Sequence, residues 1–129
     1  MDKKWEVVFI DEETALRFLR ENKANKETII IRSLDKWMGI YDGDILCSVT
    51  GIKFSNGHMG TDCSYTLPEY RNKGMFSAFY EYVMAQYPNE NFVCYCSSPY
   101  TAKVLIEKYG FKKVREFSNG TVHVSLKRS

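Results

Sequence analysis

Residues 65–76 read Tyr65-Thr66-Leu67-Pro68-Glu69-Tyr70-Arg71-Asn72-Lys73-Gly74-Met75-Phe76. A β-type run ends at Pro68, a short basic turn follows, and Gly74 opens an apolar segment of helical period that continues to Tyr87. The first amide groups of a helix have no partner inside it, and the helix dipole adds partial positive charge there. The stretch therefore predicts a strand, an anion-binding turn and a helix.

Two cationic side chains, Arg71 and Lys73, lie beside these amides, and Gly74 lacks a Cβ, so a ligand could approach the main chain closely. A solvated basic turn is the ordinary alternative. The position between a strand stopped by proline and a helix opened by glycine favours anion binding.

The segment Arg71-Asn72-Lys73-Gly74-Met75-Phe76 resembles the acetyl-CoA signature (Gln or Arg)-x-x-Gly-x-(Gly or Ala) of the GNAT-type N-acetyltransferase superfamily. Further along the chain, Ala102-Lys103-Val104-Leu105-Ile106-Glu107-Lys108-Tyr109-Gly110-Phe111 is similar to that family's penultimate helix and its terminal Gly-Phe. The two similarities together cover Asp62 to roughly Ser125, about half of the chain.

The resemblance implies an α+β (mixed α/β) fold: a single GNAT-like domain over residues 1–129, with a central, mostly antiparallel, twisted sheet splayed in the middle and helices on both faces. It implies acetyl-CoA as acyl donor, with the pantetheine arm between the strand at Tyr65 to Leu67 and the strand at Cys94 to Ser97. The pyrophosphate is expected on the amides from Arg71 to Phe76. The implied cofactor-binding residues are Tyr65, Thr66, Leu67, Arg71, Asn72, Lys73, Gly74, Met75, Phe76 and Ser97.

The chain departs from the family pattern at three positions. The family's frequent tyrosine acid, four residues before the Gly of Gly-Phe, is Ile106, which cannot donate a proton. Its frequent asparagine, seven residues earlier, is Pro99, and the second small residue of the phosphate turn is Phe76. The similarity therefore extends further to the cofactor site than to catalysis.

Asp62 and Tyr109 are the substitute candidates for catalysis. Asp62 lies near the place where some family members carry a carboxylate base, and Tyr109 lies one helical turn from Ile106. Their ordinary alternatives are a solvent-facing or hairpin-satisfied strand residue and a core anchor of the Gly-Phe corner. Ser97 has the alternative of a helix cap.

These residues predict an acyl-CoA-dependent N-acyltransferase that moves an acetyl group directly to an unidentified primary amine, either a small molecule or a protein. The alternative is a catalytically degenerate GNAT-like domain that binds acyl-CoA or serves as a protein-interaction or regulatory module. Ile106 and Pro99 favour that alternative.

Composition limits the other classes of function. The chain has 129 residues, 44% of them hydrophobic and 26% charged, with a formal charge of +2. This fits one globular domain and does not favour nucleic acid as a partner. No signal peptide or membrane-spanning run is visible, which predicts a cytoplasmic protein without a membrane partner.

All four cysteines, Cys47, Cys63, Cys94 and Cys96, fall in predicted strands and are expected to be small buried hydrophobes in a reducing compartment. A zinc site is the competing interpretation, but Cys94-Tyr95-Cys96 lacks the usual knuckle spacing, and we expect no metal. His58 and His123 are expected to be ordinary outward strand residues.

Hydrophobic period and turn residues predict the remaining elements, except over residues 23–35, where the run at 27–32 fits either a short strand or the end of a second helical segment. A helix N-cap is expected at Asp11 and hairpin turns at Asp42-Gly43, Asn56-Gly57 and Asn119-Gly120. Predicted strands are Trp5 to Ile10, Trp37 to Tyr41, Ile45 to Phe54, His58 to Leu67, Asn91 to Ser97 and a final hairpin after Phe111; predicted helices follow Asp11, run from about Lys73 to Tyr87, and begin at Pro99 after a Ser98 cap.

Overall fold

A computed structural model describes residues 5–22, 34–55, 57–96 and 99–128. The order of strands and helices is the predicted one, with one addition, a single turn of 3-10 helix in the segment after Pro68. The predicted Ser98 cap and the ambiguous run at 27–32 lie outside the described residues. The elements are β1 (Val7–Ile10), α1 (Glu12–Asn22), β2 (Lys36–Asp42), β3 (Ile45–Ser55), β4 (His58–Thr66), η2 (Pro68–Tyr70), α2 (Met75–Gln86), β5 (Asn91–Cys96), α3 (Pro99–Tyr109), β6 (Lys112–Glu116) and β7 (Val122–Leu126).

The strands form one seven-stranded sheet in the order β1-β2-β3-β4-β5-β7-β6. The β1–β2, β2–β3, β5–β7 and β6–β7 pairs are antiparallel. The β4–β5 pair is parallel and joins His58–Gly60 to Asn91–Val93. The prediction of a mixed α+β fold with a mostly antiparallel sheet is therefore confirmed.

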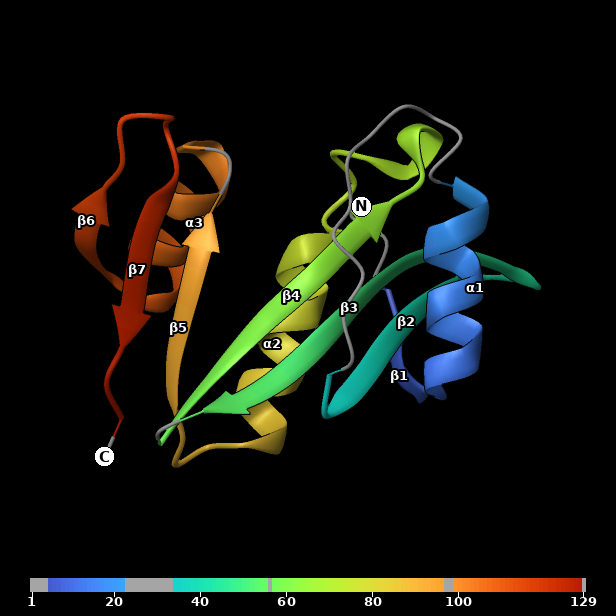
Figure 1. Ribbon diagram of the computed structural model, residues 1–129, viewed down its shortest axis with the longest axis horizontal. Helices are drawn as coiled ribbons and strands as arrows, with labels where there is room; N and C mark the ends of the chain where they lie inside the picture. Colours follow the sequence, from blue (N-terminus) through green and yellow to red (C-terminus); the bar gives the residue numbers. More distant parts are fainter. Residues whose placement is uncertain (1–4, 23–33, 56, 97–98, 129) are drawn as a thin grey trace. The chain divides into compact units, whose positions relative to one another are not determined.

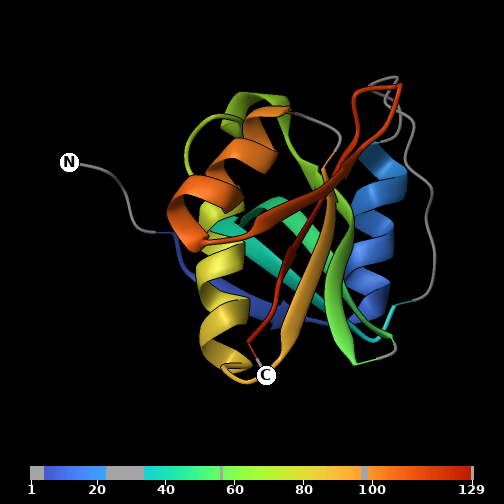
Figure 2. The same ribbon diagram turned by 90° about the vertical axis from the view of Figure 1, so that its left-hand side faces the viewer.

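The chain divides into two compact units, of which the first comprises Met1–Lys53 and Thr61–Tyr87. Within this unit α1 lies on one face of the strands and α2 on the opposite face (Figures 1 and 2). Apolar side chains of α1 and of β2, β3 and β4 pack together on the first face, as amphipathic helices do on sheets. This core consists of Ala15, Phe18, Leu19, Trp37, Val49, Cys63 and Tyr65.

The second unit comprises Phe54–Gly60 and Pro88–Ser129. Here α3 packs on β5, β6 and β7 and buries Ala102 and Leu105 (Figure 1). The helix ends as the sequence predicts: Gly110 is left-handed, with a φ of 80°, and the Phe111 amide donates back to the Leu105 carbonyl at 3.1 Å.

The four cysteines are free and buried, as predicted, and lie in β3, β4 and β5. The described residues contain no group of three or more His, Cys, Asp or Glu side chains arranged to hold a metal ion. No helix in the described ranges combines the length and the apolar character that crossing a bilayer requires.

The first helix begins with the predicted cap, because the Thr14 amide donates to Asp11 Oδ1 at 2.8 Å. Hydrogen bonds from the Thr14 side chain and then from its amide hold the pKa of Asp11 below its ordinary value. A lowered pKa stabilises the fold above the ordinary value, and this contribution is lost as pH falls through the folded pKa.

We expect Asp11→Ala to lower the melting temperature at neutral pH, and its difference from wild type to shrink below about pH 4. Asp11→Asn is the matched control, since asparagine caps a helix equally well but does not titrate. Thermal denaturation from neutral to acid pH measures both variants. A difference between Asp11→Ala and wild type that is unchanged at acid pH would contradict this role.

Candidate functional site

The turn between β4 and α2 is built around a left-handed glycine. Gly74 is the N-cap of α2, with a φ of 87° and a ψ of 10°, and among the described residues no side chain caps the helix. The first intrahelical bond runs from the Ala78 amide to the Gly74 carbonyl at 3.0 Å. The preceding amides at the helix start are therefore oriented for an acceptor from outside the helix.

Space above this glycine is open. An added Cβ at Gly74 would meet no atom within 4 Å, so glycine is needed here for its backbone conformation rather than for packing. Asn72 is also left-handed, with a φ of 62°, which asparagine tolerates better than most residues. The turn thus presents main chain with few side-chain obstacles.

Arg71 folds back on the end of β4. Its Nε donates to the Thr66 carbonyl at 2.9 Å, and its guanidinium lies 5.3 Å from the centroid of the buried Tyr65 ring. These two contacts orient an exposed cation beside the start of α2. Guanidinium groups are well suited to binding phosphate in a fixed geometry.

Residues far away in the sequence hold the turn in place. Trp5 Nε1 donates to the Lys73 carbonyl at 2.8 Å, and the Tyr70 hydroxyl donates to Asp42 Oδ2 at 2.8 Å. The Trp5 and Tyr70 rings meet edge to face at 6.3 Å, and Lys73 Nζ lies 5.7 Å from the Tyr70 ring centroid. These contacts hold in place the backbone of the turn, which carries the two cationic side chains.

The end of β4 is fixed by bonds to β3. The Leu67 amide donates to the Cys47 carbonyl at 2.9 Å, and Ser48 Oγ lies 3.2 Å from the Tyr65 carbonyl and 2.6 Å from Thr66 Oγ1. Tyr65 and Met75 are buried, at 4% and 3% exposure, so their side chains belong to the core. Only the main chain of these two predicted site residues is suited to a ligand.

Phe76 stands where the family signature has a small residue. Its ring packs against Tyr80, one helical turn later, with centroids 4.8 Å apart. The bulky side chain therefore packs along α2.

Asp62 lies next to a residue of β4 whose backbone departs from strand geometry. The next residue, Cys63, is buried and has a φ of 56°, which is unusual for a side-chain-bearing residue, and its amide donates to Asp62 Oδ1 at 2.7 Å. The half-buried carboxylate is thus bonded to the backbone of the irregularity, as the hairpin-satisfied alternative expected. Its role as a general base stays a prediction.

The other two candidates belong to the second unit. Tyr109 is the last residue of α3, in the second unit, and is half-buried with Lys108 Nζ 5.4 Å from its ring centroid. Ser97 lies outside the described residues. The structure therefore gathers the predicted residues from Tyr65 to Phe76.

Sequence reasoning missed Trp5 and Asp42, which brace the turn, and assigned no role to Tyr70. Tyr70 and Asp42 are 28 positions apart, and Trp5 and Lys73 are 68 apart. No local pattern connects partners at such separations. In the sequence, the only sign of a role for Tyr70 is that it is an aromatic residue within the basic turn.

No family model matches the sequence, and no curated protein sequence matches it. Solved structures match the fold. A histone acetyltransferase HPA2 and related acetyltransferase from Corynebacterium glutamicum aligns with a TM-score of 0.75 at 11% identity, covering 98% of each chain. Naa50 of Arabidopsis thaliana, in complex with the bisubstrate analogue CoA-Ac-MVNAL, aligns at 0.68 and 12%, covering 97% of this chain and 99% of the other.

The putative acetyltransferase YncA of Salmonella typhimurium, solved with its cofactor acetyl-CoA, aligns at a TM-score of 0.68 and 11% identity, covering 98% of this chain and 95% of the other. The chain therefore has the GNAT fold that the sequence resemblance implied.

The hydrogen bond to Asp42 raises the pKa of Tyr70 well above its ordinary value. A raised pKa stabilises the fold fully below the ordinary value of about 10, and the contribution is lost as pH rises through the folded pKa. Tyr70 is therefore a neutral hydrogen-bond donor at physiological pH, not a titrating acid or base.

We expect Tyr70→Phe to lower the melting temperature by a constant amount between about pH 6 and 9, and the difference to shrink above about pH 10. Asp42→Asn is the matched control, because it keeps an acceptor oxygen and removes the charge. Thermal denaturation across this pH range measures both. Identical melting temperatures of Tyr70→Phe and wild type at pH 7 would show that the bond does not brace the turn.

Proposed function

We propose that this protein is an acyl-CoA-dependent N-acyltransferase that uses acetyl-CoA and transfers the acetyl group to a primary amine. The observation that carries the proposal is the uncapped, left-handed start of α2 at Gly74, with Arg71 oriented beside it. Solved structures of the same fold include one with acetyl-CoA and one with a bisubstrate analogue containing CoA, which supports the same donor.

The residues of the turn fit a pyrophosphate. The space within 4 Å of a Cβ at Gly74 is open, so phosphate oxygens can approach the amides of Gly74, Met75 and Phe76. Arg71 and Lys73 add two cationic side chains at the same turn. The helix dipole, the amides and these charges all favour the same anionic group.

The pantetheine arm would pair with the main chain of β4. Because the Leu67 amide bonds toward β3, alternation in an antiparallel pair directs the backbone groups of Thr66 and Ser64 away from β3. The Thr66 carbonyl already accepts from Arg71. Its amide and the backbone of Ser64 are thus the groups that we assign to the cofactor's amides.

Bound acetyl-CoA would supply a thioester; its acyl carbon would bond to the amine nitrogen as the carbon–sulfur bond breaks, and CoA would leave as a thiolate that takes up the proton lost by the attacking nitrogen. An alkyl ammonium with a pKa of about 10.4 must first lose a proton to become the nucleophile. Asp62 is the base that we assign, acting directly or through a water molecule, and a backbone amide of β4 donates to the developing oxyanion.

A second candidate function is a binding or regulatory module without turnover. Ile106 and Pro99 favour it, since α3 carries them at the positions where the family resemblance implies a tyrosine acid and an asparagine. Such a module would keep the turn at Gly74 and bind the same donor, so donor binding alone does not distinguish the two candidates. Turnover does.

Acetyl-CoA is expected to raise the melting temperature, because a ligand bound only to the folded state stabilises it by about 2.7 kcal/mol at a hundredfold excess over Kd. Gly74→Glu should abolish this shift by placing an anion where the pyrophosphate binds. Gly57→Glu is the matched control: it has the same positive φ, open space and added charge, but lies in the hairpin before β4.

Thermal shift and calorimetry measure both variants and wild type. A flat response of wild type at millimolar acetyl-CoA, or equal binding by a folded Gly74→Glu variant, would remove this donor site.

Asp62→Asn tests the base. The amide oxygen of asparagine can still accept from the Cys63 amide, so the irregularity of β4 is kept while the proton acceptor is lost. We expect turnover of a reactive amine to fall by about 10² to 10⁴ with unchanged acetyl-CoA affinity. Asp44→Asn, in the β2–β3 turn, controls for charge. Turnover within a factor of about three of wild type would retire Asp62 as the base.

A further inference from the structure

The second unit has a strand face that none of its described helices covers. Helix α3 packs on the side of β5, β7 and β6 that holds Val122 and Val124, which are 4% and 0% exposed (Figure 1). Because side chains alternate along a strand, His123 and Ser125 point to the opposite side, and both are only partly buried. We call this side the open face; it carries Tyr95, Lys112, Arg115, Phe117, His123 and Ser125.

Aromatic rings gather on the open face. Tyr95 and Arg115 both lie opposite His123 in the pairing of β5 and β6 with β7, so the three residues form one row across three strands. The Tyr95 and His123 rings stack at 4.4 Å with 21° between their planes, and Phe117 lies 6.4 Å from the Tyr95 ring. Tyr95 is nevertheless 62% exposed. A large ring, already oriented by its neighbours, is therefore presented to solvent.

The open face also carries positive charge. The Arg115 guanidinium lies 4.6 Å from the centroid of the Phe117 ring, which fixes its direction. Lys112 lies opposite Ser125, in the next row of the same face. Both cationic residues are exposed.

No carboxylate of these strands faces the two cations. Glu116 is the one acidic residue within β5, β6 and β7. It lies opposite Val122, on the α3 side, where it pairs with Lys113 at 3.4 Å. The charge of the open face is therefore not neutralised by its own strands.

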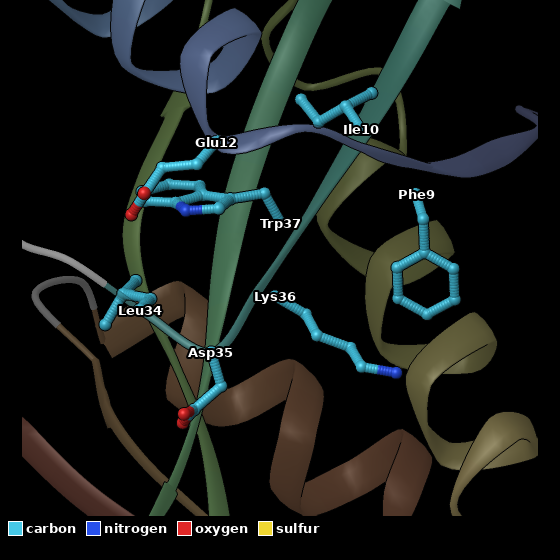
Figure 3. Close-up of a pocket in the computed structure, with 7 residues that line it drawn as sticks. All are labelled: Phe9, Ile10, Glu12, Leu34, Asp35, Lys36 and Trp37. Carbon is cyan, nitrogen blue, oxygen red and sulfur yellow. The ribbon is translucent and has the colours of Figure 1, made fainter.

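The pocket of about 350 Å³ in the first unit lacks such convergence (Figure 3). Trp37 belongs to the core with α1, whereas Lys36, the preceding residue of β2, extends toward Phe9 on the opposite face. The sheet thus separates the polar groups of this lining. On the open face, in contrast, the rings and the cations lie on one side.

Charge and shape indicate the kind of partner. Carboxylates are complementary to guanidinium and ammonium groups, and an aromatic side chain is complementary to the exposed Tyr95 ring. The same face of a second copy would bring like charges together. A formal charge of +2 for the whole chain is small for a surface that follows a phosphate backbone. Small molecules prefer concave sites, whereas a strand face suits an extended chain.

We propose that the open face docks an extended acidic segment of a partner protein that carries an aromatic residue. The partner's ring packs on Tyr95, and its carboxylates bond to Arg115 and Lys112. Two strand spacings separate the backbones of Tyr95 and Arg115 by roughly 10 Å, which is about three residues of extended chain. The aromatic and acidic residues of the partner are therefore about three positions apart. The proposal is independent of the acyl-donor site, because none of these residues belongs to the turn at Gly74.

The test uses the blocked peptide acetyl-Glu-Tyr-Ser-Ser-Glu-Glu-amide and nitrogen-15 NMR of the intact protein without acetyl-CoA. The peptide has no amine, so its binding is separate from acyl transfer. It is expected to shift the backbone amides of Tyr95, His123 and Arg115 in a saturable way. Binding should weaken as sodium chloride is raised from about 50 to about 500 mM, because salt screens exposed charges.

Two altered peptides separate charge from ring. Glutamine in place of every glutamate should weaken binding by about 10-fold or more, since the carboxylates are lost. Leucine in place of tyrosine should weaken it by about 3-fold to 10-fold, since the ring contact is lost.

Variants of the protein have matched controls. Arg115→Gln should weaken binding of the acidic peptide by about 3-fold to 10-fold. Lys113→Gln is its control, because Lys113 is an exposed cation of the same strand on the α3 side. Tyr95→Ala should have a similar effect, and Tyr100→Ala in α3 is its control, since that ring is 71% exposed. Unchanged melting temperatures would show that each variant is folded.

Four results would each overturn the proposal. The first is the absence of amide shifts on the open face at about 5 mM peptide. The second is equal affinity for the glutamine peptide. The third is an equal effect of Arg115→Gln and Lys113→Gln. The fourth is tighter binding of an oligothymidylate of about 12 nucleotides, which would assign the face to single-stranded nucleic acid. None of these results bears on acetyl-CoA binding, so failure here is distinct from failure of the acyltransferase proposal.

Discussion

The backbone of Gly74 is left-handed, and this conformation decides where α2 begins and what its first turn can bind. A residue with a Cβ would be strained at this φ, although it would meet no neighbour within 4 Å. Because glycine brings no capping side chain, the first amides of α2 keep their capacity for an external anion. The start of α2 and the orientation of its first amides depend on this one residue.

The paired strands β1 and β2 support the basic turn. Trp5, just before β1, and Asp42, at the end of β2, brace the basic turn. At the other ends of the same strands Ile10 pairs with Trp37. The place of the turn therefore depends on the pairing of these two strands.

Donor binding and proton transfer depend on different parts of the chain. The proposed anion-binding turn needs only main chain, one oriented guanidinium and a glycine, and all of these lie in one continuous segment. Proton transfer needs a side chain at a defined place, where the chain carries Ile106 in α3 and an Asp62 that is bonded to the Cys63 amide. A GNAT fold can therefore keep the proposed donor site while its catalytic groups change.

The sequence by itself determined the elements and the turn at Gly74, because hydrophobic period, the Asp11 cap and the glycines act over a few residues. It also predicted four buried cysteines and a mixed sheet. Tertiary structure alone decided the bracing of Tyr70 by Asp42, the bonding of Asp62 to the irregular backbone at Cys63, and the pairing of Ile10 with Trp37. These features join residues that only strand pairing brings together, and no local pattern encodes such a pairing.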